Sequence, residues 1–334
     1  MREEIDFVVT WVNGQDEAWQ KRRAQYTPGT DTDNSECRYQ DYGLLLYWFR
    51  GVEKFAPWVR KVHFVTEGHL PHWLNTENPK LHIVKHADYI PEEFLPTFNS
   101  NVIELWMHQI ESLSEQFVYF NDDFYLTQPV HPKNYFKNGK PCDMLAFQPV
   151  VANPENPVMS YLYLNDILVL CKYFKKRKKA AEHPRQYFHI GYPPLYFFYN
   201  ILEMAFPSYT GMYTVHGPYP LLKSTYQKLW ELEKENFIRI SANRFRSNTD
   251  ISIRLFREWQ KISGNFHPRN VKRDLGYYEI PESGSKLIYA IKIQKKKVLC
   301  INDIHLDREN IDNIILEIRR AFQEILPEKC SFEK

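Results

Sequence analysis

Two adjacent carboxylates, Asp122 and Asp123, follow a short run of bulky apolar residues in the stretch FVYFNDDFYL (117–126). A carboxylate pair beside Asn121, at the end of a buried strand, offers the hard oxygen ligands that Mg²⁺ or Mn²⁺ prefers. Such ions complete their coordination with water and substrate phosphate. The alternative is an Asx-type turn, in which the same side chains only bond to nearby backbone. The pair therefore indicates either a metal site for a phosphate-containing substrate or a turn.

A second stretch, TWVNGQDEAW (10–19), also follows an apolar run and combines side chains that suit a nucleotide. The Trp11 ring is able to stack on a base or a sugar, Gly14 lets the backbone approach a phosphate, and Asp16 adds a polar group at the edge. A tight turn at Asn13-Gly14 followed by a helix cap explains the same residues. The stretch therefore indicates either a nucleotide pocket or a turn.

A third stretch, VLCINDIHLD (298–307), echoes the first one near the end of the chain. An apolar strand is followed by Asn302 and Asp303, and then by His305. This pattern suggests a second set of oxygen ligands that faces the first carboxylate pair. Taken alone, it is no stronger than the pattern of a turn.

Two loops in the second half of the chain contain basic side chains that suit a phosphate-containing substrate. The loop NRFRSNTD places Arg246 and Asp250 ahead of a helix, and guanidinium groups match phosphate oxygens bidentately. The stretch HGPYPLLK begins with His216, a candidate base, and ends with Lys223, a candidate phosphate ligand. The alternatives are a surface loop whose arginine pairs with its own aspartate, and an ordinary loop histidine with a solvated lysine.

The first 120 residues alternate between strand-like and helix-like patterns. Strands are expected at 5–12, 61–68, 81–86 and 117–120, and helices at 41–54 and 100–116. This order predicts an α/β fold with a mostly parallel sheet covered by flanking helices. In such sheets ligands bind beyond the carboxyl ends of the strands, where the polar stretches lie. Glycosyltransferases with nucleotide-sugar donors carry a carboxylate motif in this place, so the expected architecture is GT-A-like.

The second half of the chain is more irregular. We expect strands at 285–293 and 295–303 and an amphipathic helix at 311–325. Residues 131–215 are rich in aromatic and basic side chains and interrupt the alternating pattern. We therefore expect one catalytic domain over residues 1–334, with residues 131–215 as an insertion within it.

Composition and charge exclude several classes of protein. A net charge of +2 argues against nucleic acid as the partner, because proteins that bind the phosphate backbone carry a clear basic excess. The five scattered cysteines include no CxxC pair, which argues against a disulfide framework and a zinc site and indicates a reducing compartment. No stretch approaches 18 apolar residues, so we expect a cytoplasmic protein.

Taken together, these segments resemble the Stealth family, which includes bacterial capsular-polysaccharide phosphotransferases and the catalytic subunit of the lysosomal N-acetylglucosamine-1-phosphotransferase. Four blocks match in order, and the second of them, which ends in FVYFNDDFYL, is long and specific. The blocks lie at 5–19, 38–75 with 96–126, 216–230 with 244–251, and 299–307. Residues 131–215 fall outside the blocks, so we expect acceptor specificity there. The nearest kind of member is a streptococcal-type cell-surface polysaccharide phosphotransferase.

The resemblance implies a transfer of a sugar-1-phosphate from a nucleotide sugar, here a UDP-sugar, to a hydroxyl of a glycan, with release of the nucleoside monophosphate. On this basis Asp122, Asp123 and Asp303 would hold Mg²⁺, or Mn²⁺, across the diphosphate. Arg246, helped by Lys223, would neutralise the transferred phosphoryl group. Arg38 and Asp41 would brace the site as an ion pair. The residues expected around the donor are Trp11, Asn13, Gly14, Asp16, Arg38, Asp41 and Asn121.

The identity of the general base stays open. In the animal enzyme a histidine follows the arginine that matches Arg246, whereas Ser247 stands there in this chain. His216, His305 and one of the carboxylates remain candidates, and Asp250 belongs to the residues expected to be catalytic.

Two other functions and one further partner are open. A metal-dependent glycosyltransferase would use the same donor but release UDP, and a carbohydrate-binding protein would hold cation and glycan without turnover. The basic run KYFKKRKK (172–179) suits an anionic membrane surface at the inner face of the cytoplasmic membrane, or a solvated helix end. The membrane alternative would fit an acceptor glycan built on a lipid carrier.

Overall fold

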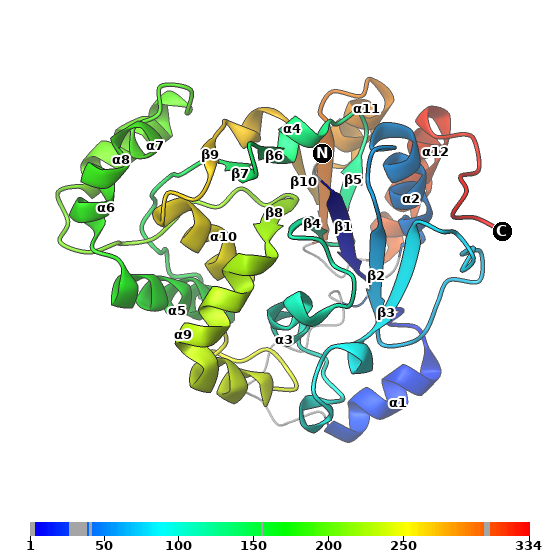
Figure 1. Ribbon diagram of the computed structural model, residues 1–334. Helices are drawn as coiled ribbons and strands as arrows, with labels where there is room; N and C mark the ends of the chain where they lie inside the picture. Colours follow the sequence, from blue (N-terminus) through cyan, green and yellow to red (C-terminus); the bar gives the residue numbers. More distant parts are fainter. Residues whose placement is uncertain (1–3, 27–38, 40–41, 155, 304–307) are drawn as a thin grey trace.

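The computed structural model describes residues 4–26, 39, 42–154, 156–303 and 308–334. Its largest sheet has five strands in the order β3-β2-β1-β4-β8 (Figure 1). The strands β1 to β4 are mutually parallel where they pair, and β8 is antiparallel to β4. The bounds are β1 Ile5–Thr10, β2 Val62–Thr66, β3 Leu81–Lys85, β4 Gln116–Phe120 and β8 Tyr219–Leu222. The predicted α/β fold with a mostly parallel sheet is confirmed.

The central strands of this sheet are buried on both faces. Along β1, Phe7 and Val9 contribute to one core cluster, and Val8 contributes to the other. Successive side chains of a strand point to opposite faces, so continuous apolar runs such as IDFVVT suit a sheet that helices cover on both sides.

Helices form a layer on each face of the sheet (Figure 1). Side chains of α2 and α12 belong to the first core cluster, and side chains of α3, α9 and α10 belong to the second. The helices are α1 Glu17–Tyr26, α2 Leu45–Phe55, α3 Ser100–Leu105, α4 Pro132–Tyr135, α5 Pro157–Tyr173, α6 Lys176–Glu182, α7 Pro184–Tyr187, α8 Pro194–Glu203, α9 Lys223–Ser241, α10 Arg254–Ile262, α11 Gly284–Lys292 and α12 Arg308–Ile325.

A second sheet adjoins the first one, with three strands in the order β10-β11-β5. Its strands are β5 Phe124–Leu126, β10 Leu275–Ile280 and β11 Val298–Asp303. Residues 121–123 connect β4 of the first sheet to β5 of the second, so the carboxylate pair lies where the two sheets meet. A third small sheet contains β6 Phe136–Lys137, β7 Lys140–Asp143 and β9 His267–Pro268.

Residues 131–215 include the helices α4 to α8. The helices α5 to α8 lie to one side of the main sheet (Figure 1), and α5 packs against α10. The division of the chain into a catalytic domain with an insertion stays a prediction. Within the described residues no helix combines the length and the apolar composition that a membrane crossing requires. The four described cysteines, Cys142, Cys171, Cys300 and Cys330, are free thiols.

Two expected elements differ from the structure. The strand expected at 285–293 is wrong, because residues 284–292 form the helix α11. The helix expected at 100–116 ends at Leu105 as α3, and a short 3₁₀ turn, Met107–Gln109, follows it. The late strand and the last helix are confirmed as β11 and α12.

Candidate active site at the junction of two sheets

The strands β1, β2 and β4 are parallel, so their carboxyl ends lie together at one end of the main sheet, which is the edge meant below. β8 is antiparallel, so it begins at this edge, and His216 lies just before it. The backbone N–H of Ile301 donates to the Asp123 carbonyl over 2.9 Å and brings the end of β11 alongside. Asp303 is the last residue of β11. Polar residues from three distant parts of the chain therefore meet at this edge.

Asp123 is the centre of this cluster. Its Oδ2 lies 3.2 Å from Nε2 of His216 and 3.2 Å from Sγ of Cys300. The His216 ring packs edge-on against Phe124, with 4.8 Å between ring centroids, which fixes the ring beside the carboxylate. The side chains of His216 and Asp123 are 40% and 22% exposed, so a substrate can reach both of them.

The other oxygen of Asp123, Oδ1, is buried and has no hydrogen-bond partner within the part of the chain that the structure describes. A buried carboxylate oxygen without a partner is costly unless a ligand satisfies it. The ligand atoms of Asp123, His216 and Cys300 lie within 4.8 Å of one another. This donor set fits a metal ion.

The thiol of Cys300 does not suit the role of a ligand for a hard cation. Burial raises the pKa of Cys300 well above its ordinary value, and the charge of Asp123 raises it further. The thiol therefore stays protonated and donates its hydrogen bond to Asp123. Carboxylate oxygen is then the ligand that this cluster offers, and it is the kind of ligand that Mg²⁺ and Mn²⁺ prefer.

Glu104 of α3 was not singled out from the sequence. It is buried, and it accepts a hydrogen bond of 2.9 Å from the hydroxyl of Tyr119, which also contacts the Thr10 hydroxyl at 3.1 Å. Burial raises the pKa of Glu104 to about 7, although the Arg246 guanidinium opposes this shift. Because Glu104 follows Ser100 by four residues, its sequence position suggests helix capping, and only the tertiary contacts indicate a further role.

Arg246 lies near the same edge. Its Nε and Nη2 donate to Oγ of Ser100 over 3.2 and 2.6 Å, and its charge acts on Glu104. The N-terminus of α3 therefore fixes one side of this guanidinium.

Asp250 is buried and positions a loop. Its carboxylate accepts hydrogen bonds of 2.7 to 3.1 Å from the side chains of Asn99, Asn101 and Asn243 and from the backbone of Ser247. Burial raises the pKa of Asp250, although these bonds favour its charged form. The network fastens the loop that carries Arg246 to the start of α3, which gives Asp250 a positioning role.

Lys223 lies at the amino end of β4, whereas the carboxylate pair follows the carboxyl end of this strand. The preceding residue, Leu222, pairs with Gln116 at the start of β4, and the backbone N–H of Lys223 donates to Glu115 over 2.9 Å. The five residues of β4 separate these two ends by about 15 Å. The structure therefore does not bring Lys223 to the other site residues.

The loop after β1 forms a turn and a helix cap. Oδ1 of Asp16 accepts the backbone N–H of Trp19 over 2.7 Å, at the start of α1. A Cβ on Gly14 would lie 2.0 Å from the Tyr39 carbonyl, so this glycine permits a close approach of backbone. The Trp11 ring is buried, 7% exposed, and stacks on Phe64 at 5.6 Å. Asn13 accepts the Gln15 N–H through its side chain.

The remaining predicted residues divide into two groups. Asn121 and Asp122 are half-buried in the turn between β4 and β5, where the Asp122 carbonyl accepts the Tyr125 hydroxyl at 2.7 Å. Arg38, Asp41 and His305 lie outside the described residues, as does the side chain of Asp303.

Comparison with known proteins identifies the family of this chain. Residues 3–31 match the model of Stealth protein CR1, conserved region 1, and residues 38–143 match that of Stealth protein CR2, conserved region 2. The chain is 40% identical to the capsular polysaccharide phosphotransferase WcwK of Streptococcus pneumoniae over 332 residues, which cover 99% of each protein. The chain belongs to the Stealth family.

Other relatives are similar over nearly their whole length. The receptor polysaccharide phosphotransferase WefC of Streptococcus gordonii is 37% identical, and the match covers 100% of both chains. The exopolysaccharide phosphotransferase cps2G of Lactiplantibacillus plantarum is also 37% identical, over 99% of this chain and 96% of the relative. The predicted resemblance is confirmed. Among solved structures, mouse xyloside xylosyltransferase 1 matches with 9% identity and a TM-score of 0.37, over 92% of this chain and 99% of that one. A likeness at this level supports no statement about the reaction.

Proposed function

We propose that this protein is a polysaccharide phosphotransferase that moves a hexose-1-phosphate, or an N-acetylhexosamine-1-phosphate, from a UDP-sugar to a hydroxyl of a growing cell-surface glycan. The product is a phosphodiester, and UMP leaves. The full-length identity to bacterial polysaccharide phosphotransferases supports the reaction class. The assignment of the active site rests mainly on the carboxylate of Asp123. One of its oxygens faces His216, and the other is buried without a described partner.

The metal would be Mg²⁺ or Mn²⁺, and Asp122, Asp123 and Asp303 would hold it. Oδ1 of Asp123 supports this assignment because it is buried without a described partner, and Oδ2 stays with His216. When bound, the ion supplies positive charge to the phosphate oxygens of the donor. Asn121 and the loop of residues 11–16 lie around the donor side, with Asp16 and Gly14 shaping that loop.

His216 acts as the general base. Its Nε2–H faces Asp123, which leaves Nδ1 to accept the proton of the acceptor hydroxyl. The hydroxyl oxygen forms a bond to the phosphorus that carries the sugar, and the bond from this phosphorus to the bridging oxygen of UMP breaks. Arg246, held by Ser100, stabilises the charge of the transferred phosphoryl group. His305 stays an alternative base.

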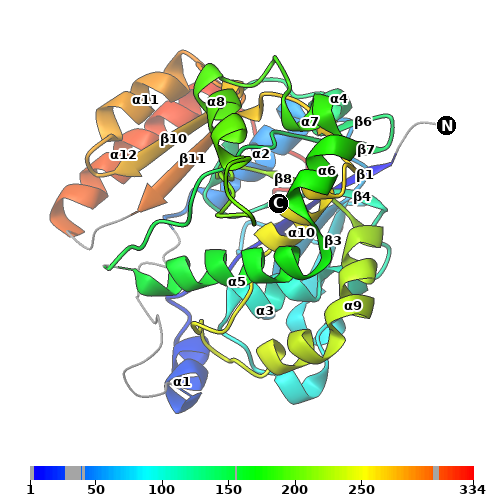
Figure 2. The same cartoon turned by 90° about the vertical axis from the view of Figure 1, so that its left-hand side faces the viewer.

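The acceptor partner is a glycan on a lipid carrier, and residues 131–215 select it. Exposed apolar side chains recur on α5, on α8 and next to α8, and we refer to them together as the α5/α8 face. On α8 the buried side chains are Tyr196, Asn200 and Glu203, whereas Phe198 on the outer side is 54% exposed. Figure 2 shows α5, α6 and α8 on the side turned to the viewer. The face consists of Tyr161, Leu164, Leu168, Ile190, Leu195, Phe198, Ile201, Leu202 and Phe206.

An anionic bilayer suits this face because cations adjoin it. The basic run 172–179 begins at the end of α5 and continues into α6, and Lys172, Lys175, Arg177 and Lys178 in it are exposed. Apolar side chains beside lysine and arginine are the pattern of proteins that rest on anionic lipid. The lipid-linked acceptor would then reach the site from the membrane surface.

The identity of the nucleotide product tests the reaction. The protein is incubated with Mg²⁺, a panel of UDP-sugars and a glycan acceptor, and the products are analysed by mass spectrometry. We expect UMP together with a phosphodiester-linked sugar. UDP with a plain glycoside would instead establish a glycosyltransferase, and binding of glycan without either nucleotide would leave a carbohydrate-binding protein.

A further inference from the structure

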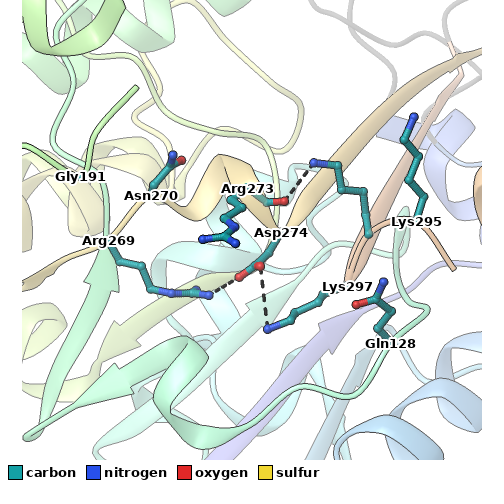
Figure 3. A pocket seen from close by; sticks show the side chains of 9 residues that line it. Gln128, Gly191, Arg269, Asn270, Arg273, Asp274, Lys295 and Lys297 are labelled. Carbon is teal, nitrogen blue, oxygen red and sulfur yellow. Dashed lines mark hydrogen bonds and ion pairs between the residues drawn. The ribbon is translucent and has the colours of Figure 1, made fainter. Parts of the chain in front are cut away.

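A cavity of about 520 Å³ lies away from Asp123, at the amino ends of β10 and β11 (Figure 3). Five of its lining residues carry a positive charge and one carries a negative charge. The lining consists of Gln128, Gly191, Arg269, Asn270, Arg273, Asp274, Lys295, Lys296 and Lys297. In the sequence the run QKKKV resembles a solvated turn, so nothing there separates these lysines from ordinary surface residues.

The backbone of this lysine run is fixed on both sides. Thr127, at the end of β5, donates its hydroxyl to the Lys296 carbonyl over 2.6 Å and its N–H to the Lys297 carbonyl over 2.9 Å. From the other side, the N–H of Lys297 donates to the Asp274 carbonyl over 3.0 Å. The backbone of Lys296 and Lys297 therefore forms a fixed wall of the cavity.

The charges around the cavity are only partly balanced. Asp274 forms ion pairs with Arg269 and, over 3.8 Å, with Lys297. Nζ of Lys296 donates to the Arg273 carbonyl over 2.9 Å (Figure 3). Neither Arg273 nor Lys295 forms an ion pair with a carboxylate of the described residues. Cations that face one cavity repel each other, and a bound anion removes this repulsion.

The cavity is separate from the candidate active site. Lys297 precedes β11, and four residues further along this strand the Ile301 N–H bonds to Asp123, so the two places are about 13 Å apart. Gly191 on the cavity rim follows Ile190, which is 92% exposed and belongs to the α5/α8 face. One side of the cavity thus adjoins the surface that we assign to the membrane.

We propose that this cavity binds a phosphate or diphosphate group of the acceptor substrate, an assignment that rests on the proposed function. Planar guanidinium forks and lysine ammonium groups are the side chains that recognise such oxyanions. Two sources carry this chemistry: the diphosphate that joins a glycan to a lipid carrier, and a phosphodiester within the growing polymer. In either case the anion anchors the acceptor while its hydroxyl reaches the candidate active site.

Calorimetric titration with inorganic pyrophosphate tests the cavity without any turnover. EDTA is present, so that no metal-dependent binding at Asp123 contributes. We expect Arg273→Ala/Lys295→Ala to weaken binding by about tenfold or more. The matched control is Lys228→Ala/Lys234→Ala, which removes two exposed cations of α9, and both this pair and Asp123→Asn should bind like the wild type. Wild-type affinity for pyrophosphate in Arg273→Ala/Lys295→Ala would overturn the proposal.

Two further probes distinguish the sources. Tighter binding of isopentenyl diphosphate supports the lipid-linked diphosphate, and tighter binding of glycerophosphoglycerol supports a phosphodiester. Failure of both to compete with pyrophosphate would contradict the proposal. The variant Arg273→Lys/Lys295→Arg keeps both charges and should restore binding, which separates loss of charge from loss of fold.

Kinetics connect the cavity to the reaction. In the transfer assay, Arg273→Ala/Lys295→Ala should raise KM for the acceptor and leave kcat and KM for the UDP-sugar unchanged. A rise in the donor KM instead would place the anion site on the donor path and overturn the assignment. If the wild type releases no UMP, the proposed function fails, whereas the calorimetric result on the cavity still stands.

Discussion

The two carboxylate oxygens of Asp123 have different surroundings, which makes this residue the sharpest test of the site. Oδ2 contacts His216 and Cys300, whereas Oδ1 is buried without a described partner. We expect Asp123→Asn to lower the rate of UMP release by about 10²-fold or more, because an amide neither carries the negative charge nor holds a cation as well. The backbone bond to Ile301 remains, so the melting temperature should change little.

Cys300→Ser is the matched control for this experiment. A serine hydroxyl still donates to Asp123, but it is no thiolate ligand. We expect Cys300→Ser to keep activity within a few-fold of the wild type. If it is as inactive as Asp123→Asn while folded, then the cluster is a thiolate metal site, and the assignment of ligands is wrong.

At the scale of residues, the sequence indicated which side chains follow strands but not where those side chains point. The turn with Asp123 and the loop with His216 are 93 residues apart, and pairing of β4 with β8 brings them together. Gly14 and Asp16 looked equally suited to a nucleotide, yet their observed contacts are those of a turn and a helix cap. Lys223 follows the carboxyl end of β8, and because β8 is antiparallel to β4, this end lies away from the site. The stretch HGPYPLLK does not reveal the direction of this strand.

The buried carboxyl group of Asp166 ties the helix α5 to the segment before α10. It accepts the backbone N–H of Ser252 over 3.0 Å and the Ser252 hydroxyl over 2.6 Å. Burial raises the pKa of Asp166 to about 7, from an ordinary value of 3.8. In the unfolded chain the group ionises near pH 4, whereas in the folded chain it stays protonated to about pH 7. The contribution of Asp166 to the free energy of unfolding is therefore present below pH 4 and is lost as pH rises to 7.

Asp166→Asn removes this pH dependence, because an amide keeps the shape of the side chain and has no charge to bury. We expect the variant to be more stable than the wild type at pH 8, on the order of 4 kcal/mol, and about equal to it at pH 4. Urea unfolding at several pH values measures the difference. A constant difference across this range would show that Asp166 does not titrate on folding, and the pH-dependent role of this contact would be wrong.

At the scale of elements, the hydrophobic pattern predicted the parallel strands of the main sheet well. It gave the wrong type of element for residues 285–293, where the apolar residues suit either a strand or a helix. In SKLIYAIKI the apolar residues suit a strand, but Leu287, Ala290 and Ile291 are buried with the spacing of one helix face. Residues 284–292 form a helix because α11 packs against α12, and the sequence pattern of α11 alone does not show this contact. The connection of β4 to β5 across two sheets is likewise set by long-range pairing with β11, so the sequence alone did not reveal it.

For the whole molecule, the α5/α8 face is an exception to the usual placement of apolar residues. Single exposed apolar side chains are common, but grouped ones indicate a surface that is covered in the working state. On α8 the outer side carries leucine, isoleucine and phenylalanine, and the inner side carries Asn200 and Glu203. Glu203 binds Lys176 over 3.0 Å inside the protein, so the polar residues of α8 are satisfied by the fold and the apolar ones are left outside.

Sedimentation with lipid vesicles tests this face. The wild type should bind vesicles that contain anionic lipid and bind neutral vesicles more weakly, with an affinity that falls as salt rises. Phe198→Glu should lower the affinity for anionic vesicles by about tenfold or more, because it replaces an apolar contact with a charge that the lipid repels. The matched control is Tyr289→Glu on α11, which changes an exposed aromatic residue outside the face and should bind like the wild type. The contrary outcome is that the wild type binds neither kind of vesicle and that Phe198→Glu converts a dimer into a monomer. In that case a second copy of the chain covers this face, and the membrane assignment is wrong.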